Sequence, residues 1–259
     1  MSFEFKYLIP LKEVDNLREQ IKPFTRLTSN AALNPSGEMT VRSIYFDTPA
    51  FDHFHYRRDK ITLRKDVRMS GQDIDVTKVF LETARQNDDV FSKTKATVPF
   101  DRIKQMFNGD IHSSEFLWSI NKKEAASKFF FQIHRYNLRP VIKIVHDREP
   151  FTSIIPDKEN DFKIIIQKNF RCSAFPAIDS LFEEGTMKNV LQNQAILTIR
   201  YSRSIPAWLK PLLTEIKFSQ GRMSKYRICM ESLPEINVRS KFGNLVKGRF
   251  FNQNMPSSG

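Results

Sequence analysis

Five cationic side chains lie at alternate positions of short apolar segments: Lys6, Lys60, Arg64, Lys163 and Arg200. Side chains on a β-strand point alternately to opposite faces, so this spacing places each cation on the polar face of a strand. Forked guanidinium groups and mobile ammonium groups bind phosphate oxygens directly. The spacing therefore indicates an anion site built on a sheet.

The sign of these polar faces is unusual, because Glu4 is the one carboxylate among the five cations. A sheet with one solvated face is the ordinary explanation of alternation, but an ordinary protein surface mixes charges of both signs. If the strands close into a barrel with this face inside, the cations repel one another unless a polyanion lies among them. That arrangement would be a basic tunnel for phosphates.

The motifs of several other chemistries are missing from the sequence. It contains no GxxxxGK[ST], GxGxxG, GxSxG or HExxH pattern, and it has only eight glycines. Its two cysteines, Cys172 and Cys229, lack metal-ligand spacing. We therefore expect phosphate recognition by charged side chains rather than by a glycine-rich loop.

The composition agrees with a polyanionic ligand. The 259 residues include 41 Lys or Arg and 29 Asp or Glu, which gives a formal net charge of +12. Such a field favours nucleic acid, anionic lipid or polyphosphate without choosing among them. The low cysteine count favours a reducing compartment, and no segment approaches the ~20 apolar residues of a membrane span. We expect a soluble, cytoplasmic protein.

The order and periodicity of the segments predict an antiparallel α+β fold, and the cations on the polar faces favour a closed antiparallel β-barrel with helices packed outside. The expected strands are residues 2–9, 41–46, 60–64, 79–83, 141–146, 162–168 and 196–201. The expected helices are residues 11–22, 100–107, 115–121, 124–131 and 207–218. Turns are expected at residues 34–37 and at Ser70 and Gly71. Residues 1–235 are predicted to form one tunnel domain, and residues 236–259 a flexible basic tail.

Several segments together resemble the VTC domain, a family named after the vacuolar transporter chaperone complex. The resemblance lies in FEFKYLIP at 3–10, VRSIYFDTP at 41–49, FLE at 80–82, PVIKIVHDREPF at 140–151, ILTIRYSRSIPAWL at 196–209 and SKY at 224–226. These domains are polyphosphate polymerases of the triphosphate tunnel metalloenzyme superfamily. The resemblance implies phosphoryl transfer from ATP inside a basic barrel, with a divalent metal, Mn²⁺ or Mg²⁺, held by carboxylates.

The resemblance also implies roles for individual residues. By position, Lys6, Arg64, Arg148, Lys163, Arg200 and Lys225 correspond to phosphate ligands. The strand spacing adds Lys60, and Arg85 or Lys93 is the replacement for a cation that the family has at Ala84. Of these, Lys6, Arg64, Arg148 and Arg200 are predicted to be catalytic, and Glu4 and Glu82 to bind the metal.

The chain departs from the family pattern at other positions of the site. Thr198 stands where the family has a metal-binding Glu, and Ile165 and Gln167 stand where Thr and Asp are usual. His146 occupies a common Tyr position. Two acidic positions are therefore neutral, which favours anion binding but removes hard oxygen ligands for the metal.

Three functions remain open from the sequence. The first is a polyphosphate polymerase or triphosphatase-like phosphotransferase acting on ATP, and the second is an inactive module of the same fold that binds polyphosphate or phosphorylated ligands. The third is a nucleic-acid-binding protein, suggested by the strings FHYRR and KGRFF. It ranks last because 23 phenylalanines indicate core packing and no RNP-like motif is present.

Overall fold

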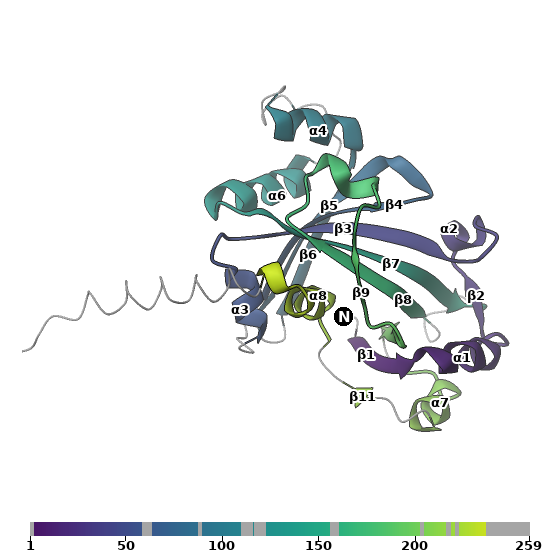
Figure 1. Cartoon of the computed structure of the whole chain (residues 1–259). Coiled ribbons are helices and arrows are strands. Elements are labelled where there is room, and N and C mark those ends of the chain that lie inside the picture. Colours follow the sequence, from purple (N-terminus) through teal and green to yellow (C-terminus); the bar gives the residue numbers. More distant parts are fainter. Residues whose placement is uncertain are drawn as a thin grey trace, which may run out of the picture.

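The computed structural model describes residues 3–58, 64–87, 90–109, 116, 123–155, 161–202, 205–215, 219–220 and 223–236. Their centre is a curved sheet (Figure 1) in which the strands pair in the order β11-β1-β10-β8-β7-β3-β4-β5-β6, with β2 and β9 added beside β7 and β8. The strands are β1 (Phe3–Pro10), β2 (Thr25–Leu27), β3 (Met39–Asp47), β4 (Arg64–Gln72), β5 (Asp75–Asn87), β6 (Val90–Pro99), β7 (Arg139–Ser153), β8 (Phe162–Ala174), β9 (Lys188–Val190), β10 (Gln194–Tyr201) and β11 (Ser219–Gln220).

The sheet is antiparallel and mixed with helices, as the sequence predicts, but its closure into a barrel is not confirmed. The strand order ends at β6 on one side and β11 on the other, and no ladder joins those ends within the described ranges. β11 has only two residues and pairs only with Tyr7 and Leu8 of β1. The described part of β11 therefore adds only one short pairing at this edge of the sheet.

Two groups of helices cover one face of the sheet, which we call the outer face. α4 (Phe100–Asn108) and α6 (Lys123–Arg135) bury Ile103, Phe129 and Phe130 against β3 to β6. At the other end, η1 (Leu11–Glu13), α1 (Val14–Ile21) and α7 (Leu209–Glu215) pack on β1, β8 and β10. The spacing of Val14, Leu17 and Ile21 gives α1 one apolar stripe, and all three side chains are buried.

The opposite face, here the inner face, is partly covered by α3 (Asp52–Arg58) and α8 (Lys225–Ser232), as Figure 1 shows. Tyr226, Cys229 and Met230 of α8 are buried with Phe170 and Cys172 of β8. Both cysteines are free thiols. Ile236, the last described residue, is also buried in this cluster, and residues 237–259 lie outside the described ranges.

Three short elements, α2 (Ser29–Ala32), η2 (Asp179–Phe182) and β9, complete the described fold. η2 lies close to Gly71 of β4, where a Cβ would come 2.4 Å from Cζ of Phe182. The prediction of a turn at Ser70 and Gly71 is therefore wrong: the glycine lies inside a strand because a side chain packs directly on its backbone. The turn at residues 34–37 is confirmed, and Gly37 has a φ of +69°.

The predicted strands at residues 2–9, 41–46, 79–83, 141–146, 162–168 and 196–201 are confirmed as parts of β1, β3, β5, β7, β8 and β10. Four of the predicted helices overlap η1 with α1, α4, α6 and α7, whereas residues 115 and 117–121 lie outside the described ranges. Residues 60–63 also lie outside them, so the strand predicted there is seen only from Arg64 onward. Within the described ranges no helix is long and apolar enough to span a membrane.

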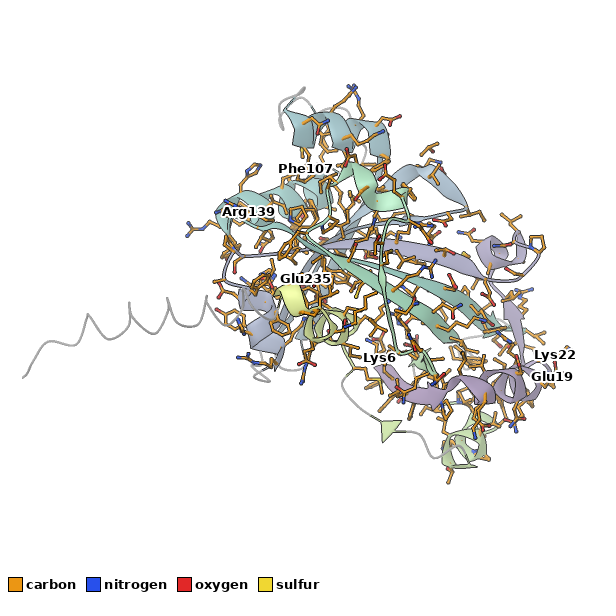
Figure 2. All side chains as sticks on the ribbon, in the orientation of Figure 1. Lys6, Glu19, Lys22, Phe107, Arg139 and Glu235 are labelled. Atoms are coloured by element: carbon orange, nitrogen blue, oxygen red, sulfur yellow. The ribbon has the colours of Figure 1, made fainter. Side chains whose placement is uncertain are left out.

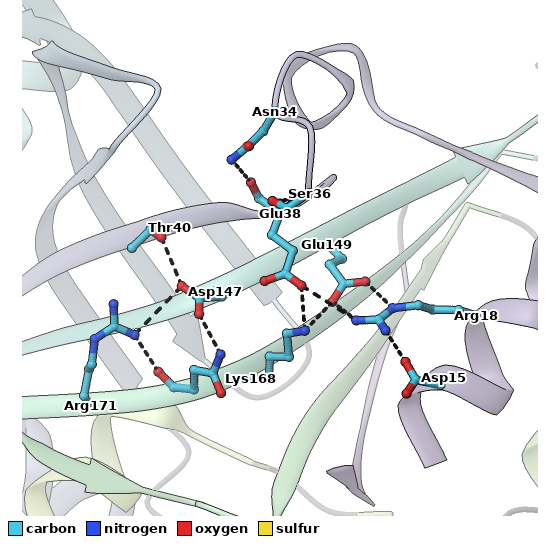
Figure 3. Close-up of polar contacts among 11 residues, drawn as sticks. Asp15, Arg18, Asn34, Ser36, Glu38, Thr40, Asp147, Glu149, Lys168 and Arg171 are labelled. Atoms are coloured by element: carbon cyan, nitrogen blue, oxygen red, sulfur yellow. Dashed lines mark hydrogen bonds and ion pairs between the residues drawn. The ribbon is translucent and has the colours of Figure 1, made fainter. Parts of the chain in front are cut away.

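Ion pairs of mixed sign join elements on the outer face (Figure 3). Arg18 of α1 donates from Nε and Nη2 to Glu149 of β7 at 2.8 and 2.7 Å. Lys168 of β8 lies 3.3 Å from the same carboxylate and 2.6 Å from that of Glu38. Because the Glu149 side chain is only 6% exposed, this network binds α1 to two strands in a poorly solvated place.

We predict that Glu149→Gln lowers the free energy of unfolding by about 2 kcal/mol, because Arg18 and Lys168 lose the buried carboxylate that they share. Urea titration at neutral pH measures this change. The matched control is Glu19→Gln, since Glu19 pairs with Lys22 at 3.5 Å on the solvent side of α1 (Figure 2) and exposed pairs contribute little. Equal losses in both variants would contradict a special role for the Glu149 network.

Candidate functional site

The strand register brings most of the predicted cations to the inner face. Residues opposite each other in a ladder share a face, and Lys6 lies opposite Thr198, which lies opposite Ile165. By the same rule Glu4, Arg200 and Lys163 form one row. Three further rows complete the face: Arg148 with Gln167, Arg68 with Glu82 and Lys95, and Ala84 with Lys93.

One carboxylate neutralises the β1 and β10 end of this face. Glu4 lies 2.8 Å from Lys6 and accepts a hydrogen bond from Nε of Arg200. Partial burial opposes ionisation of Glu4, but these two cations outweigh it and lower the pKa of the carboxyl to about 2. Glu4 is therefore a paired carboxylate rather than a free one.

A second carboxylate neutralises the β4 to β6 end. Glu82 accepts from Nε of Arg68 and lies 2.9 Å from Nζ of Lys93. Burial of Glu82 raises the pKa of its carboxyl, but the two cations outweigh burial and lower this pKa to about 2. Arg68 also donates from Nη1 to the hydroxyl of Tyr45 at 3.0 Å. Lys93 thus occupies the inner face near Glu82, as its predicted role requires.

Arg148 lies in the middle of the inner face and has no ion pair with any described residue. Its Nε atom is buried without a hydrogen-bond partner. Burial, together with the charges of Arg200 and Arg68, lowers the pKa of the guanidinium to about 10, although Glu82 acts in the opposite direction. A largely buried cation without an ion-pair partner is a strong candidate for an anion-binding group.

Lys225 enters the same region from α8. Its Nζ atom lies 3.1 Å from Nε2 of His146, and Nε2 also contacts the amide nitrogen of Gln167 at 2.8 Å. Burial and then repulsion from Arg68, Lys6 and Arg148 hold the pKa of Lys225 well below its usual range. Burial and the charge of Lys225 also depress the pKa of His146, which favours the neutral imidazole with the Nε2 lone pair toward these two nitrogens.

These electrostatic effects show how strongly the sheet curves. Lys6 on β1 and Arg68 on β4 both act on Lys225, although four strands separate β1 from β4 in the sheet. Arg148 responds to Arg200 of β10 as well as to Glu82 of β5. The inner face therefore brings charges from both halves of the sheet close to one another, although no ladder joins β6 to β11 among the described residues.

A β-bulge aligns the middle of the site. The register of β7 and β8 shifts between Val145 and Asp147, and Asn169 opposite the shift has a φ of +53°. The extra residue lets both Gln167 and Phe170 face His146, whose ring stacks on Phe170 with centroids 5.2 Å apart. Lys168 consequently points to the outer face, where it joins the Glu149 network.

Some predicted site residues are not part of this described cluster. Lys60 lies outside the described ranges, and Arg64 is the first residue of β4, opposite Gln86. Lys163 is on the inner face but is exposed. Arg68 and Lys95 were missed by the sequence analysis, although continuing the alternation from Arg64 through position 66 reaches Arg68.

The carboxylates predicted to bind a metal are both paired with cations. Glu4 and Glu82 each already bind two cations and lie in different end clusters. Thr198 supplies a buried hydroxyl with no hydrogen-bond partner where the resemblance implies a carboxylate. Among described residues no group of three His, Cys, Asp or Glu side chains is placed to hold a metal ion. The metal site at Glu4 and Glu82 therefore stays a prediction.

The fold and site define an α+β protein whose curved antiparallel sheet concentrates positive charge on one face. The model of the VTC domain family matches residues 2–234, and the chain belongs to that family. No curated protein matches the chain. The structure of PH1819 protein from Pyrococcus Horikoshii OT3 is similar, with 13% identity and a TM-score of 0.45 over 89% of this chain and 100% of that chain. At that level the similarity says nothing about function.

We predict that Glu82 makes folding sensitive to acid. Its folded pKa of about 2 lies below the ordinary value of 4.5, so its stabilising contribution is complete above about pH 5 and is lost as the pH falls toward 2. The contribution at neutral pH is about 3 kcal/mol. Glu82→Gln should therefore be less stable than the natural protein at pH 6, and the difference should shrink at pH 3.

Urea titrations at a series of pH values measure this difference. Glu19→Gln is again the control, because an exposed carboxyl should leave the pH profile unchanged. A destabilisation by Glu82→Gln that stays constant from pH 6 to pH 3 would contradict the assigned ion pairs.

Proposed function

We propose that this chain is a VTC-like phosphotransferase that binds the phosphates of ATP and of polyphosphate on its inner face. The observation that carries the proposal is the unpaired, largely buried guanidinium of Arg148 between two neutralised ends of the face. Membership in the VTC domain family supports polyphosphate as the ligand. A chain of phosphates running across the face would supply the counter-charge that Arg148 and Lys225 lack.

The proposed reaction is transfer of the γ-phosphoryl group of ATP. A terminal oxygen of phosphate or polyphosphate forms a bond to the γ-phosphorus, the bond from that phosphorus to the bridging oxygen breaks, and ADP leaves with the electron pair. The protein contributes by orienting the chain and by neutralising charge on the transferred group. We assign these tasks to Lys6, Arg68, Arg148, Arg200 and Lys225.

We propose that the divalent metal belongs to the substrate, ATP entering as its Mg²⁺ or Mn²⁺ complex. Magnesium is commonly held through substrate phosphates, waters and one or two carboxylates. The residues here fit that arrangement better than a resident metal centre, because both inner carboxylates are engaged by cations.

A second candidate is a binding module without turnover. Ala84 and Thr198 favour it, since they replace a cation and a carboxylate that the VTC resemblance implies, and Thr198 Oγ1 is buried in the same row as Lys6. Such a module would use the same cations for polyphosphate but would not transfer phosphate. The string FHYRR, which suggested base stacking, lies largely in α3 with Phe54 buried, and this weakens the nucleic-acid alternative.

We predict that Arg148→Gln weakens tripolyphosphate binding by about tenfold or more, because a charge-assisted hydrogen-bond donor is lost. Isothermal titration of the purified full chain measures the affinity. Arg135→Gln removes the same charge from the exposed end of α6 and is the matched control. Equal losses in both variants, or tighter binding of RNA than of polyphosphate, would support diffuse electrostatic binding instead.

Turnover is tested by incubating the same proteins with ATP and Mg²⁺ or Mn²⁺, followed by gel detection of polyphosphate and measurement of released ADP. We expect polyphosphate and ADP to appear together and Arg148→Gln to reduce both. Tight binding of tripolyphosphate without either product would assign the binding-module function.

We predict that Thr198→Glu increases Mn²⁺ affinity, because it places a hard anionic ligand on the face that holds Glu4. Thr198→Gln, which is the same size without the charge, is the control for buried volume. Manganese electron paramagnetic resonance measures the bound fraction. The new carboxylate is desolvated, so the variant should also unfold more easily when metal is removed. Equal Mn²⁺ binding by the two variants would place the metal elsewhere.

A further inference from the structure

Asp47 is a fully buried carboxylate that joins three elements. It follows Phe46 at the end of β3 and accepts hydrogen bonds from the backbone N–H groups of Thr48, His53 and Phe54 at 2.7, 2.9 and 3.0 Å. The hydroxyl of Tyr226 donates to its Oδ2 atom at 2.6 Å. Asp47 therefore fixes both the start of α3 and the first turn of α8.

Lys225 lies between two anchored residues. Tyr226 on one side is held by Asp47, and Ser224 on the other side accepts from the backbone N–H of Arg227 and from Nη1 of Arg57 at 3.1 Å. Arg57 in turn pairs with Asp66 of β4 at 2.5 Å. These contacts fix the backbone on both sides of Lys225 before any ligand binds.

The anchors oppose a repulsive force. Lys6, Arg68 and Arg148 all act on Lys225, and repulsion would favour rotation of its side chain away from them. The Tyr226 ring adds a second restraint, because it stacks on Tyr45 with centroids 5.1 Å apart. Tyr45 is also the residue whose hydroxyl accepts from Arg68. The stacked pair of Tyr45 and Tyr226 thus restrains two inner-face cations. Tyr45 accepts a hydrogen bond from Arg68, and Tyr226 follows Lys225 in α8.

We propose that Asp47, Tyr226 and Tyr45 are positioning residues that hold Lys225 and Arg68 toward the same phosphate site. This inference rests on the proposed function, because it assigns a task to residues that support the proposed phosphate-binding cations. Asp47 fixes Tyr226, Tyr226 fixes the helix that carries Lys225, and the stacked Tyr45 holds Arg68 through its hydroxyl. The motifs around residues 45–47 and 224–226 therefore act as one unit across the molecule.

The test is a double-mutant cycle on the full chain. Tyr226→Phe keeps the ring but removes the hydrogen bond to Asp47, and we expect tripolyphosphate affinity to fall about threefold to tenfold. Lys225→Met should lower it further. If Tyr226 acts through Lys225, adding Tyr226→Phe to Lys225→Met should cause no additional loss. Tyr45→Phe should behave in the same way toward Arg68→Met.

Tyr136→Phe is the control, because it makes the same chemical change at an exposed residue. A merely structural role for Tyr226 would lower stability and multiply with Lys225→Met, and that result would overturn the proposal. Unchanged tripolyphosphate affinity in Tyr226→Phe would also overturn the proposal.

A second measurement separates this inference from the proposed function. In the ligand-free protein, the ¹⁵N chemical shift of His146 Nε2 reports its contact with Lys225, and the signal is assigned by its loss in His146→Asn. Tyr226→Phe should shift this signal, and Tyr136→Phe should not. If the natural protein fails to bind tripolyphosphate, the proposed function fails, and the His146 shift alone then supports or overturns the positioning of Lys225.

Discussion

Repulsion among like charges on the inner face is the constraint that the rest of the structure must satisfy. Lys6, Arg68, Arg148 and Lys225 come from four different elements and influence one another electrostatically. Two carboxylates neutralise the ends of the face, and the middle has no such partner among the described residues. The folded state holds this charge because apolar packing on both faces stabilises the same strands.

Charges are paired on the outer face of the sheet, whereas cations are in excess on the inner face. On the outer face, Arg18, Lys168, Glu38 and Glu149 alternate in sign, and each charge has a partner of opposite sign (Figure 3). On the inner face the cations outnumber the carboxylates, and the pKa of Lys225 falls rather than rises. The outer network needs no ligand, whereas the inner face gains most from a bound anion.

Period-two alternation was enough to predict most strands and much of the inner face, since Lys6, Glu4, Thr198 and Arg200 share a row or neighbouring rows as expected. The prediction from alternation failed where the two-residue period of a strand is interrupted. The bulge at Asn169 reverses the faces along β8, and no local pattern marks it. Sheet closure also depends on edge strands, and a two-residue strand such as β11 has no sequence periodicity.

A different reason explains why the sequence did not predict helices α3 and α8. Both are short, and their boundaries depend on tertiary contacts, above all on the buried carboxylate of Asp47. The direction of Lys225 follows from those contacts and not from its neighbours in sequence. The VTC resemblance predicted Lys225 as a phosphate ligand, and the structure places its Nζ atom beside His146, but the resemblance gave no physical reason for that placement.

The paired ends and unpaired middle also determine where an anion gains most free energy. A phosphate near Glu4 or Glu82 must compete with a carboxylate that already binds two cations, and the low pKa of each carboxyl reflects how firmly those pairs are held. A phosphate near Arg148 displaces no protein acceptor, because its buried Nε has none. The same phosphate would reduce the repulsion that depresses the pKa of Lys225, so binding and proton uptake at this lysine favour each other. The carboxylates at the two ends therefore direct a polyanion toward the middle of the sheet.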